Sequence, residues 1–68
     1  MPKKSILADN IKRYRKRLNI SQDKLSKLSN VAYNTIIKIE SGRNLNPTMK
    51  TLTKIASALG VSIDELAK

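Results

Sequence analysis

The chain has 68 residues and a formal net charge of +9, because 14 lysines and arginines face only five acidic residues. It has no cysteine and no histidine, which excludes disulfides, thiolate metal sites and the usual general base of enzymes. We therefore expect one small domain that is not an enzyme, holds no cofactor or metal ion, and is attracted to polyanions.

A first helix is predicted after a short N-terminal tail. Residues 1–4 are interpreted as a flexible basic tail, and Ser5 as the N-cap of a helix that ends at Asn19. One face of this helix is apolar, with residues at helical spacing: Leu7, Ile11, Tyr14 and Leu18. Asn19 suits the left-handed conformation that ends a helix, and Ile20 is expected to return to the core.

Two short helices are predicted on either side of a tight turn at residues 29–31. Ser21 is the expected N-cap of the first of them, in which Leu25 and Leu28 are predicted to face the core. Asn30 is expected at positive φ, because asparagine tolerates that conformation better than most residues. Val31 is expected to fill the angle between the two helices.

The helix after the turn is predicted over residues 33–40, ending before Gly42. At about 100° per residue, one side of it carries the residues expected in the core: Ile36, Ile39 and Glu40. The opposite side carries a polar strip: Asn34, Lys38 and Ser41. Ile37 falls on the border of the strip and Tyr33 in the exposed first turn. The strip has no evident role inside a folded domain, which makes it the candidate binding surface.

Two more helices complete the chain. Thr48 is the expected N-cap of a fourth helix that ends at Gly60, with these residues facing inward: Leu52, Ile55, Ala56 and Leu59. Ser62 and Glu65 have the spacing of a capping box for a short fifth helix over residues 63–67. Because no strand pattern occurs, we predict an all-α fold in a single domain over residues 1–68.

Four segments in this order and spacing give the chain a family resemblance. They are IKRYR at residues 11–15, ISQDKLS at residues 20–26, TIIKIESG at residues 35–42 and NPTMKTLTKIASALGVS at residues 46–62. The chain resembles the Cro/C1-type helix-turn-helix family, the lambda-repressor-like or Xre-type domains. The resemblance implies a compact five-helix DNA-binding domain whose helix-turn-helix consists of the second and third helices.

The resemblance also implies roles for particular residues. The base-contacting candidates are Tyr33, Asn34 and Lys38. Ile37 at the rim of this face is a further candidate from its own chemistry, for contact with a thymine methyl group, and the alternative is that it is only an exposed apolar residue. The phosphate-contacting candidates are Gln22, Thr35 and Arg43, and Gln22 also resembles a residue that braces the recognition helix. Arg15 and Glu40 match a structural pair that holds the first helix to the end of the third. The side-chain chemistry of Lys38 and Asn34 agrees with contact to bases, because lysine suits guanine O6 and N7 and asparagine suits adenine N6 and N7.

Two positions depart from the family pattern. Asn30 stands where the turn usually has glycine, and Ala32 stands where the N-cap is usually serine or threonine.

One group of residues near the C-terminus is more apolar than the edge of a small monomer needs: Val61, Ile63 and Leu66. We assign them to a homodimer interface, and the alternative is that they only close the core of the monomer.

The function predicted from these features is sequence-specific binding of double-stranded DNA by a transcriptional repressor. The expected partner is a pseudo-palindromic operator, with no small-molecule effector evident. No apolar run reaches the roughly 18 residues of a membrane span, so we expect a cytoplasmic, prokaryotic protein without membrane contact. Two alternatives remain open: an antitoxin of the same fold whose main partner is a toxin protein, and a non-specific polyanion binder.

Overall fold

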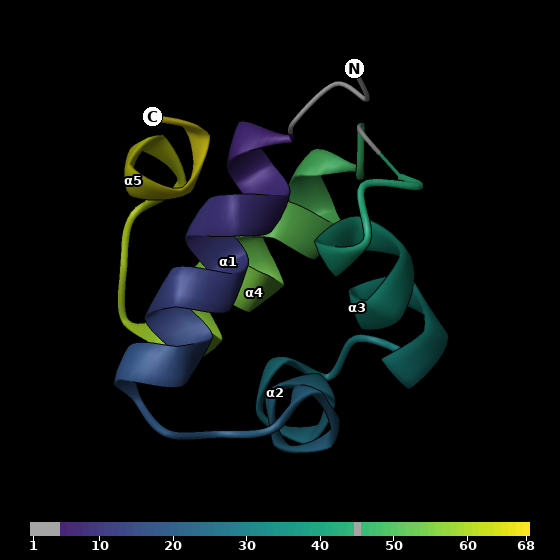
Figure 1. The fold of residues 1–68 in the computed structure, drawn as a ribbon, viewed down its shortest axis with the longest axis vertical. Coiled ribbons are helices and arrows are strands. Elements are labelled where there is room, and N and C mark those ends of the chain that lie inside the picture. The colour runs from purple at the N-terminus through teal and green to yellow at the C-terminus, as the bar shows by residue number, and fades with distance from the viewer. Residues whose placement is uncertain (1–4, 45) are drawn as a thin grey trace.

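The computed structural model describes residues 5–44 and 46–68, which form five helices and no strand (Figure 1). In chain order these are α1 (Ile6–Arg17), α2 (Gln22–Ser29), α3 (Tyr33–Glu40), α4 (Met49–Leu59) and α5 (Ile63–Ala67). The all-α prediction is confirmed over these residues, and the tail predicted at residues 1–4 lies outside them. Figure 1 shows α1 passing in front of α4, with α5 on one side and α3 on the other.

Four of the helices begin at side chains that cap them. The hydroxyl oxygens of three predicted N-caps accept a backbone N–H three residues later at 3.0–3.1 Å: Ser5, Ser21 and Thr48. Ser62 and Glu65 form a complete capping box, because each side chain accepts the backbone N–H of the other residue, at 3.1 and 3.0 Å. These bonds satisfy amides that have no partner within their helix, which confirms the predicted starts.

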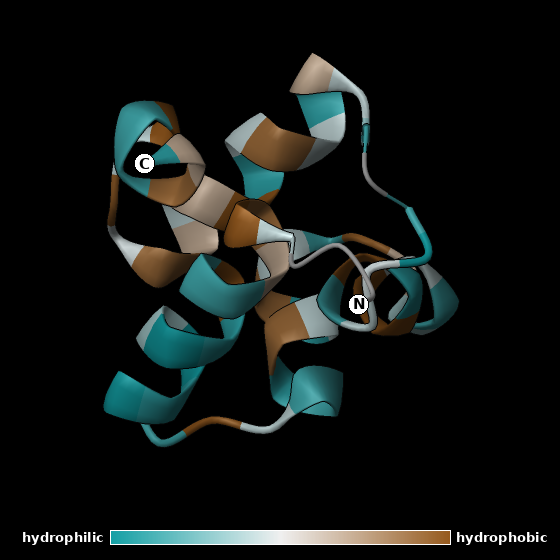
Figure 2. Cartoon of the chain, turned by 45° about the horizontal axis from the view of Figure 1, so that its top comes forward, coloured by the Kyte–Doolittle hydropathy of each residue, from teal (hydrophilic) through white to brown (hydrophobic). Residues whose placement is uncertain are grey.

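The core is apolar and receives side chains from all five helices. Its largest fully buried side chains are Ile11, Leu25, Ile36, Ile39, Ile55 and Leu66. Each such side chain contributes about 1.5–3 kcal/mol by leaving water. Figure 2 shows the apolar residues on the facing sides of the helices, whereas the outer turns of α1 are hydrophilic.

Two leucines that were expected in the core lie on the surface instead. Leu18 is 49% exposed and Leu28 is 52% exposed, so both predictions were wrong. Leu18 follows the last residue of α1, where the chain turns away from the core. Leu28 lies at the edge of the apolar stripe of α2, and the neighbouring Ser29 occupies the buried position, where its hydroxyl donates to the Leu25 carbonyl oxygen at 2.7 Å.

A buried asparagine that the sequence interpretation did not single out joins α1 to α5. The Asn10 side-chain amide donates to the carbonyl oxygens of Leu66 at 2.8 Å, Lys68 at 3.1 Å and Glu65 at 3.4 Å. Carbonyls at the end of a helix have no partner within it, so Asn10 supplies the missing donors from a different helix. Only its polarity at a helix position hinted at this role, because its partners are 55 to 58 residues away.

Candidate nucleic-acid interface

α3 separates a buried side from an exposed side along its whole length. Ile36, Ile39 and Glu40 are at most 2% exposed, and they fix the helix against the rest of the domain. On the outer side the polar strip is exposed: Asn34, Lys38 and Ser41. Tyr33 in the first turn is also exposed, whereas Thr35 and Ile37 at the borders are half-buried. Asn34 and Lys38 therefore share one outward face, with Ile37 at its border and Tyr33 at the start of the helix.

The carboxylate of Glu40, at the C-terminal end of α3, joins three helices. Arg15 of α1 binds it with two hydrogen bonds, from Nε to Oε2 at 2.8 Å and from Nη2 to Oε1 at 3.0 Å. Gln22 of α2 donates from Nε2 to Oε1 at 3.1 Å, and a third Arg15 bond goes to the Ile20 carbonyl oxygen at 3.0 Å. A two-pronged guanidinium–carboxylate bond fixes direction as well as distance, so it sets the orientation of α3.

Gln22 lies at the start of α2, and its side chain reaches α3. Its amide nitrogen carries two hydrogens, of which the Glu40 bond uses one. The second hydrogen is chemically free to meet a ligand at the helix N-terminus. One side chain can therefore brace α3 and contact an anion at the same time.

The turn between α2 and α3 has the conformation expected from its sequence. Asn30 adopts the left-handed conformation at φ 58°, and the Val31 N–H donates back to the Ser26 carbonyl oxygen at 3.1 Å. Val31 is buried in the core cluster between the helices. The asparagine in place of the usual glycine thus makes the same turn, since it tolerates positive φ.

α3 begins without a side-chain cap. Ala32 occupies the N-cap position at φ −56° and ψ 140°, and its methyl group has no atom that accepts a hydrogen bond. Its carbonyl oxygen accepts the N–H groups of Thr35 and Ile36 at 2.9 and 3.1 Å, as the first intrahelical acceptor should. The amides before these two residues lie at the positive end of the helix dipole, an arrangement that favours a nearby anion.

The end of α3 positions the candidate basic residue Arg43. Gly42 has φ 81°, and the Arg43 N–H then donates to the Lys38 carbonyl oxygen at 2.9 Å. The turn keeps Arg43 next to the last turn of the helix with its side chain exposed. Two exposed cations, Lys38 and Arg43, therefore lie close together in this part of the surface.

The residues assigned to a dimer interface do not share one environment. Leu66 is 0% exposed in the single chain, so it has no surface to offer a partner, and its assignment was wrong. Leu66 lies in α5 and points into the core of the monomer. Val61 and Ile63 are half-buried and pack against that core while keeping some apolar surface outside.

The surface around α3 is rich in hydrogen-bond donors. In residues 5–44 and 46–68, no three metal-ligating side chains lie together. No helix of this part of the chain is long and apolar enough to cross a membrane. What the surface of α3 does offer is amide, ammonium and guanidinium donors on an outward face, which are groups that bind phosphates and base edges.

Comparison with known proteins extends these observations. A family profile described as helix-turn-helix matches residues 11–66. The chain is 36% identical to the control protein C.SmaI of Serratia marcescens over 63 residues, covering 93% of this chain and 74% of that protein. It is 44% identical to the cryptic phage CTXphi transcriptional repressor RstR of Vibrio cholerae over 52 residues, covering 76% of this chain and 46% of that protein.

A solved structure has the same fold over nearly the whole chain. The N-terminal DNA binding domain of SinR from Bacillus subtilis superimposes with a TM-score of 0.91 at 29% identity. The superposition covers 96% of this chain and 94% of that domain. The arrangement of α2, α3 and the turn between them is thus shared with a protein domain named for binding DNA.

Proposed function

Because this chain belongs to the Cro/C1-type helix-turn-helix family, we propose that it is a transcriptional regulator that binds double-stranded DNA in a sequence-specific manner. The observation that carries the proposal is the division of α3. Its inner side is fixed by the core and by Glu40, and its outer side presents an exposed polar strip. A rigid helix with free donors is what reading a major groove requires.

Asn34 and Lys38 read the bases in this proposal. They are four residues apart, which is about 6 Å along the helix axis. Base pairs rise by about 3.4 Å each, so the two side chains reach pairs about two steps apart. Asn34 suits adenine and Lys38 suits guanine, while Tyr33 and the half-buried Ile37 are positioned to contact thymine methyl groups.

Phosphate contacts on both sides of α3 orient the protein on the duplex. Gln22 supports this role from the N-terminus of α2, Thr35 from the border of α3, and Arg43 from the loop that follows. The uncapped amides at the start of α3 add a further donor site. Such contacts fix register without reading sequence, and each weakens with added salt.

We further propose that the protein is a cytoplasmic repressor that acts as a homodimer. Val61 and Ile63 support this, because they keep apolar surface beside α5 after packing on the core. A two-fold pair of recognition helices would lie about 34 Å apart and fit a pseudo-palindromic operator. Sedimentation at micromolar concentration is expected to show a dimer that Val61→Glu converts to monomer, and a monomeric wild type would refute this part.

Selection of bound duplexes from a random pool tests the function directly. The wild type is expected to return one motif, and Asn34→Ala and Lys38→Ala are each expected to relax one position of it. Loss of a good base contact corresponds to about 1–3 kcal/mol, or roughly 5- to 150-fold in discrimination. Arg43→Ala is the control, because it should weaken all duplexes alike and lower the salt slope by about 0.9.

Two results would contradict the proposal. A pool that returns no motif would identify a non-specific polyanion binder. An unchanged motif in the double variant Asn34→Ala/Lys38→Ala would show that α3 does not read the bases.

A further inference from the structure

A group of basic side chains lies on the part of α1 that faces away from α3. Three of its exposed cations form what we call the outer α1 surface: Arg13, Lys16 and Arg17. Arg15 on the same helix points to Glu40 of α3. At about 100° per residue, Arg13 and Arg17 are each about 160° around the helix from Arg15. They therefore point to the opposite side of the molecule.

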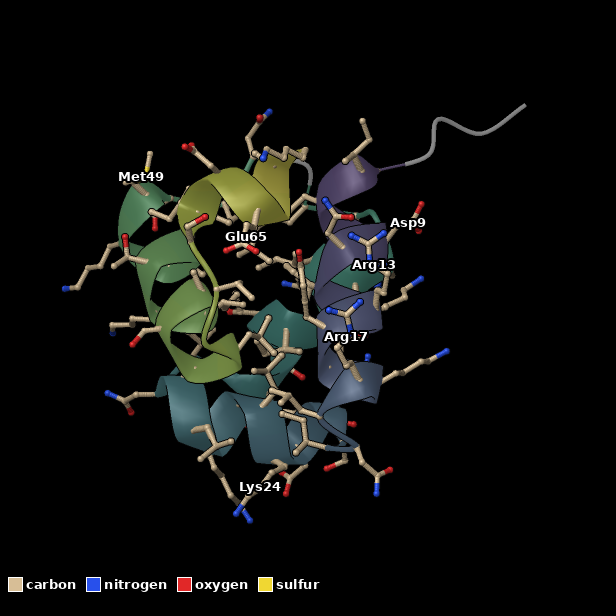
Figure 3. All side chains as sticks on the ribbon, turned by 90° about the vertical axis from the view of Figure 1, so that its left-hand side faces the viewer. Asp9, Arg13, Arg17, Lys24, Met49 and Glu65 are labelled. Atoms are coloured by element: carbon tan, nitrogen blue, oxygen red, sulfur yellow. The ribbon has the colours of Figure 1, made fainter. Side chains whose placement is uncertain are left out.

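The figures agree with this geometry. Figure 3 shows Arg13 and Arg17 one above the other on the near side of α1. This view looks at the side that Figure 1 draws on the left, whereas α3 is on the right of Figure 1. A duplex in contact with α3 therefore leaves these two side chains uncovered.

Arg13 and Arg17 are exposed, and both guanidinium groups contact the same aromatic ring. Their guanidinium carbons lie 5.4 and 5.5 Å from the centroid of the Tyr14 ring, within the range of a cation–π contact. Tyr14 itself is half-buried and packs against the core. The ring thus restrains two planar donor groups one helical turn apart, which reduces the entropy that a ligand contact would cost.

Nearby carboxylates do not neutralise the two arginines. Within the described part of the chain, the ion pairs closer than 4.0 Å are Arg15 with Glu40 and Lys27 with Asp23. The Glu65 carboxylate of α5 accepts the Ser62 N–H of the capping box. Asp9 is one turn before Arg13 and marks the N-terminal limit of the basic surface.

We propose that the outer α1 surface binds the phosphate backbone of a second DNA duplex while α3 occupies the first. Arg13 and Arg17 are four residues apart, about 6 Å along the axis of α1, and the exposed Lys16 lies beside them. Duplex DNA carries one negative charge per about 1.7 Å, so such a row meets several phosphates at once. One chain would then link two duplexes or two segments of one duplex.

Two features favour phosphate over an acidic protein. The centre of the surface is entirely charged, whereas the centre of a protein–protein interface is depleted of charge and rich in apolar groups. DNA interfaces are the polar and positively charged kind. The helix dipole accounts for cations in the last turn of α1, but it accounts neither for Arg13 nor for the stacking of both arginines on one ring.

A capture assay with the full chain tests the proposal. A biotinylated 20-base-pair duplex is immobilised and loaded with protein, and a fluorescent 20-base-pair duplex of unrelated sequence is then added at 0.1 M salt. The wild type is expected to capture the second duplex. R13Q/R17Q is expected to capture it at least about tenfold more weakly and to lower the salt slope by about 1.8, which corresponds to two phosphate contacts.

Matched variants separate the arginine pair from the general charge of the protein. K24Q/K27Q removes the same two charges from α2 and is expected to capture like the wild type. R13K/R17K keeps the charge but not the planar stacked groups, and it is expected to fall between the wild type and R13Q/R17Q. The proposal would be overturned if R13Q/R17Q or R13K/R17K captured the second duplex as strongly as the wild type does. Circular dichroism checks that each variant is folded.

Two further measurements keep this inference distinct from the proposed function. In the Asn34→Ala/Lys38→Ala variant, the Arg13 and Arg17 Nε–H signals in NMR are still expected to shift when the unrelated duplex is added. Absence of that shift would overturn the inference and leave the reading of bases by α3 untouched. Tighter capture of polyglutamate than of the second duplex, lost in R13Q/R17Q, would assign the surface to an acidic protein and also overturn it.

Discussion

α1 is joined to α3 and to α5 by two buried polar contacts of different kinds. At the α3 junction, an arginine forms a two-pronged bond with the Glu40 carboxylate. At the α5 junction, the neutral amide of Asn10 donates to three carbonyl oxygens. The charged contact is strongly directional, and its loss costs much free energy. The neutral contact supplies donors to the end of a helix, and its loss costs less.

The difference follows from what each helix does. α3 must hold its outer strip in one orientation, and a bidentate bond to a carboxylate that is 2% exposed permits only one. α5 has only to place Leu66 in the core, for which a capped start and apolar packing suffice. Four predictions test this contrast, in order of decreasing effect.

Replacing Arg15 should give the largest loss of stability. Arg15→Ala leaves the buried Glu40 carboxylate with Gln22 as its remaining side-chain donor, which should cost about 3–5 kcal/mol in the free energy of unfolding. A small domain has only about 5–15 kcal/mol in total, so the variant should be close to unfolding. Urea titration followed by circular dichroism measures the change.

Two companion variants show whether the buried charge is the cause. Glu40→Ala should cost less, because Arg15 is 14% exposed and keeps its bond to the Ile20 carbonyl oxygen. It should still loosen α3 and weaken DNA binding. Arg15→Met/Glu40→Leu should recover much of the lost stability, and a double variant as unstable as Arg15→Ala would argue against this explanation.

Removing the Asn10 amide should have the next largest effect. Asn10→Ala leaves carbonyl oxygens at the end of α5 without donors in a buried site, which should cost about 1–3 kcal/mol. Hydrogen exchange is expected to accelerate for amides of α5 while those of α3 remain protected. Equal acceleration in both helices would show that the two junctions are not independent.

Adding the missing cap of α3 should stabilise the protein. Ala32 already occupies the N-cap position, at φ −56° and ψ 140°, so Ala32→Ser should raise the free energy of unfolding by about 0.5–2 kcal/mol. Thermal unfolding measures the gain, with Ser62→Ala as the reverse change at α5. If Ala32→Ser did not raise the free energy of unfolding, the first N–H groups of α3 would already have other hydrogen-bond partners.

The smallest effect should be a pH response of the α5 cap. Hydrogen bonds from the Ser62 backbone and hydroxyl lower the pKa of Glu65 below its ordinary value. The contribution of Glu65 to the free energy of unfolding is therefore fully present above the pKa that this carboxyl has in the unfolded chain. It is lost as pH falls through the lower pKa that the carboxyl has in the folded chain. NMR titration of the Glu65 carboxyl carbon reports this, and Ser62→Ala should return the pKa toward its ordinary value.

The fold was largely predictable because its local signals are strong. Helix caps and positive-φ turns depend on residues within about four positions of each other, so Ser5, Ser21, Asn30 and Ser62 could be assigned from spacing alone. The division of α3 into two sides followed in the same way from its helical period. The roles of Asn34, Lys38, Gln22, Thr35 and Arg43 in DNA binding remain predictions until they are measured.

By itself, the sequence determined where each helix begins and which side of α3 is polar, since these depend on nearest neighbours along the chain. α1, which was expected to end at Asn19, ends at Arg17. Only the tertiary structure decided that Leu66 is buried, that Leu18 and Leu28 are exposed, and that Asn10 closes α5. The physical reason is that burial depends on which distant helix covers a residue. An apolar pattern shows that a side chain favours a core, but the packing of the helices decides which side chains are covered.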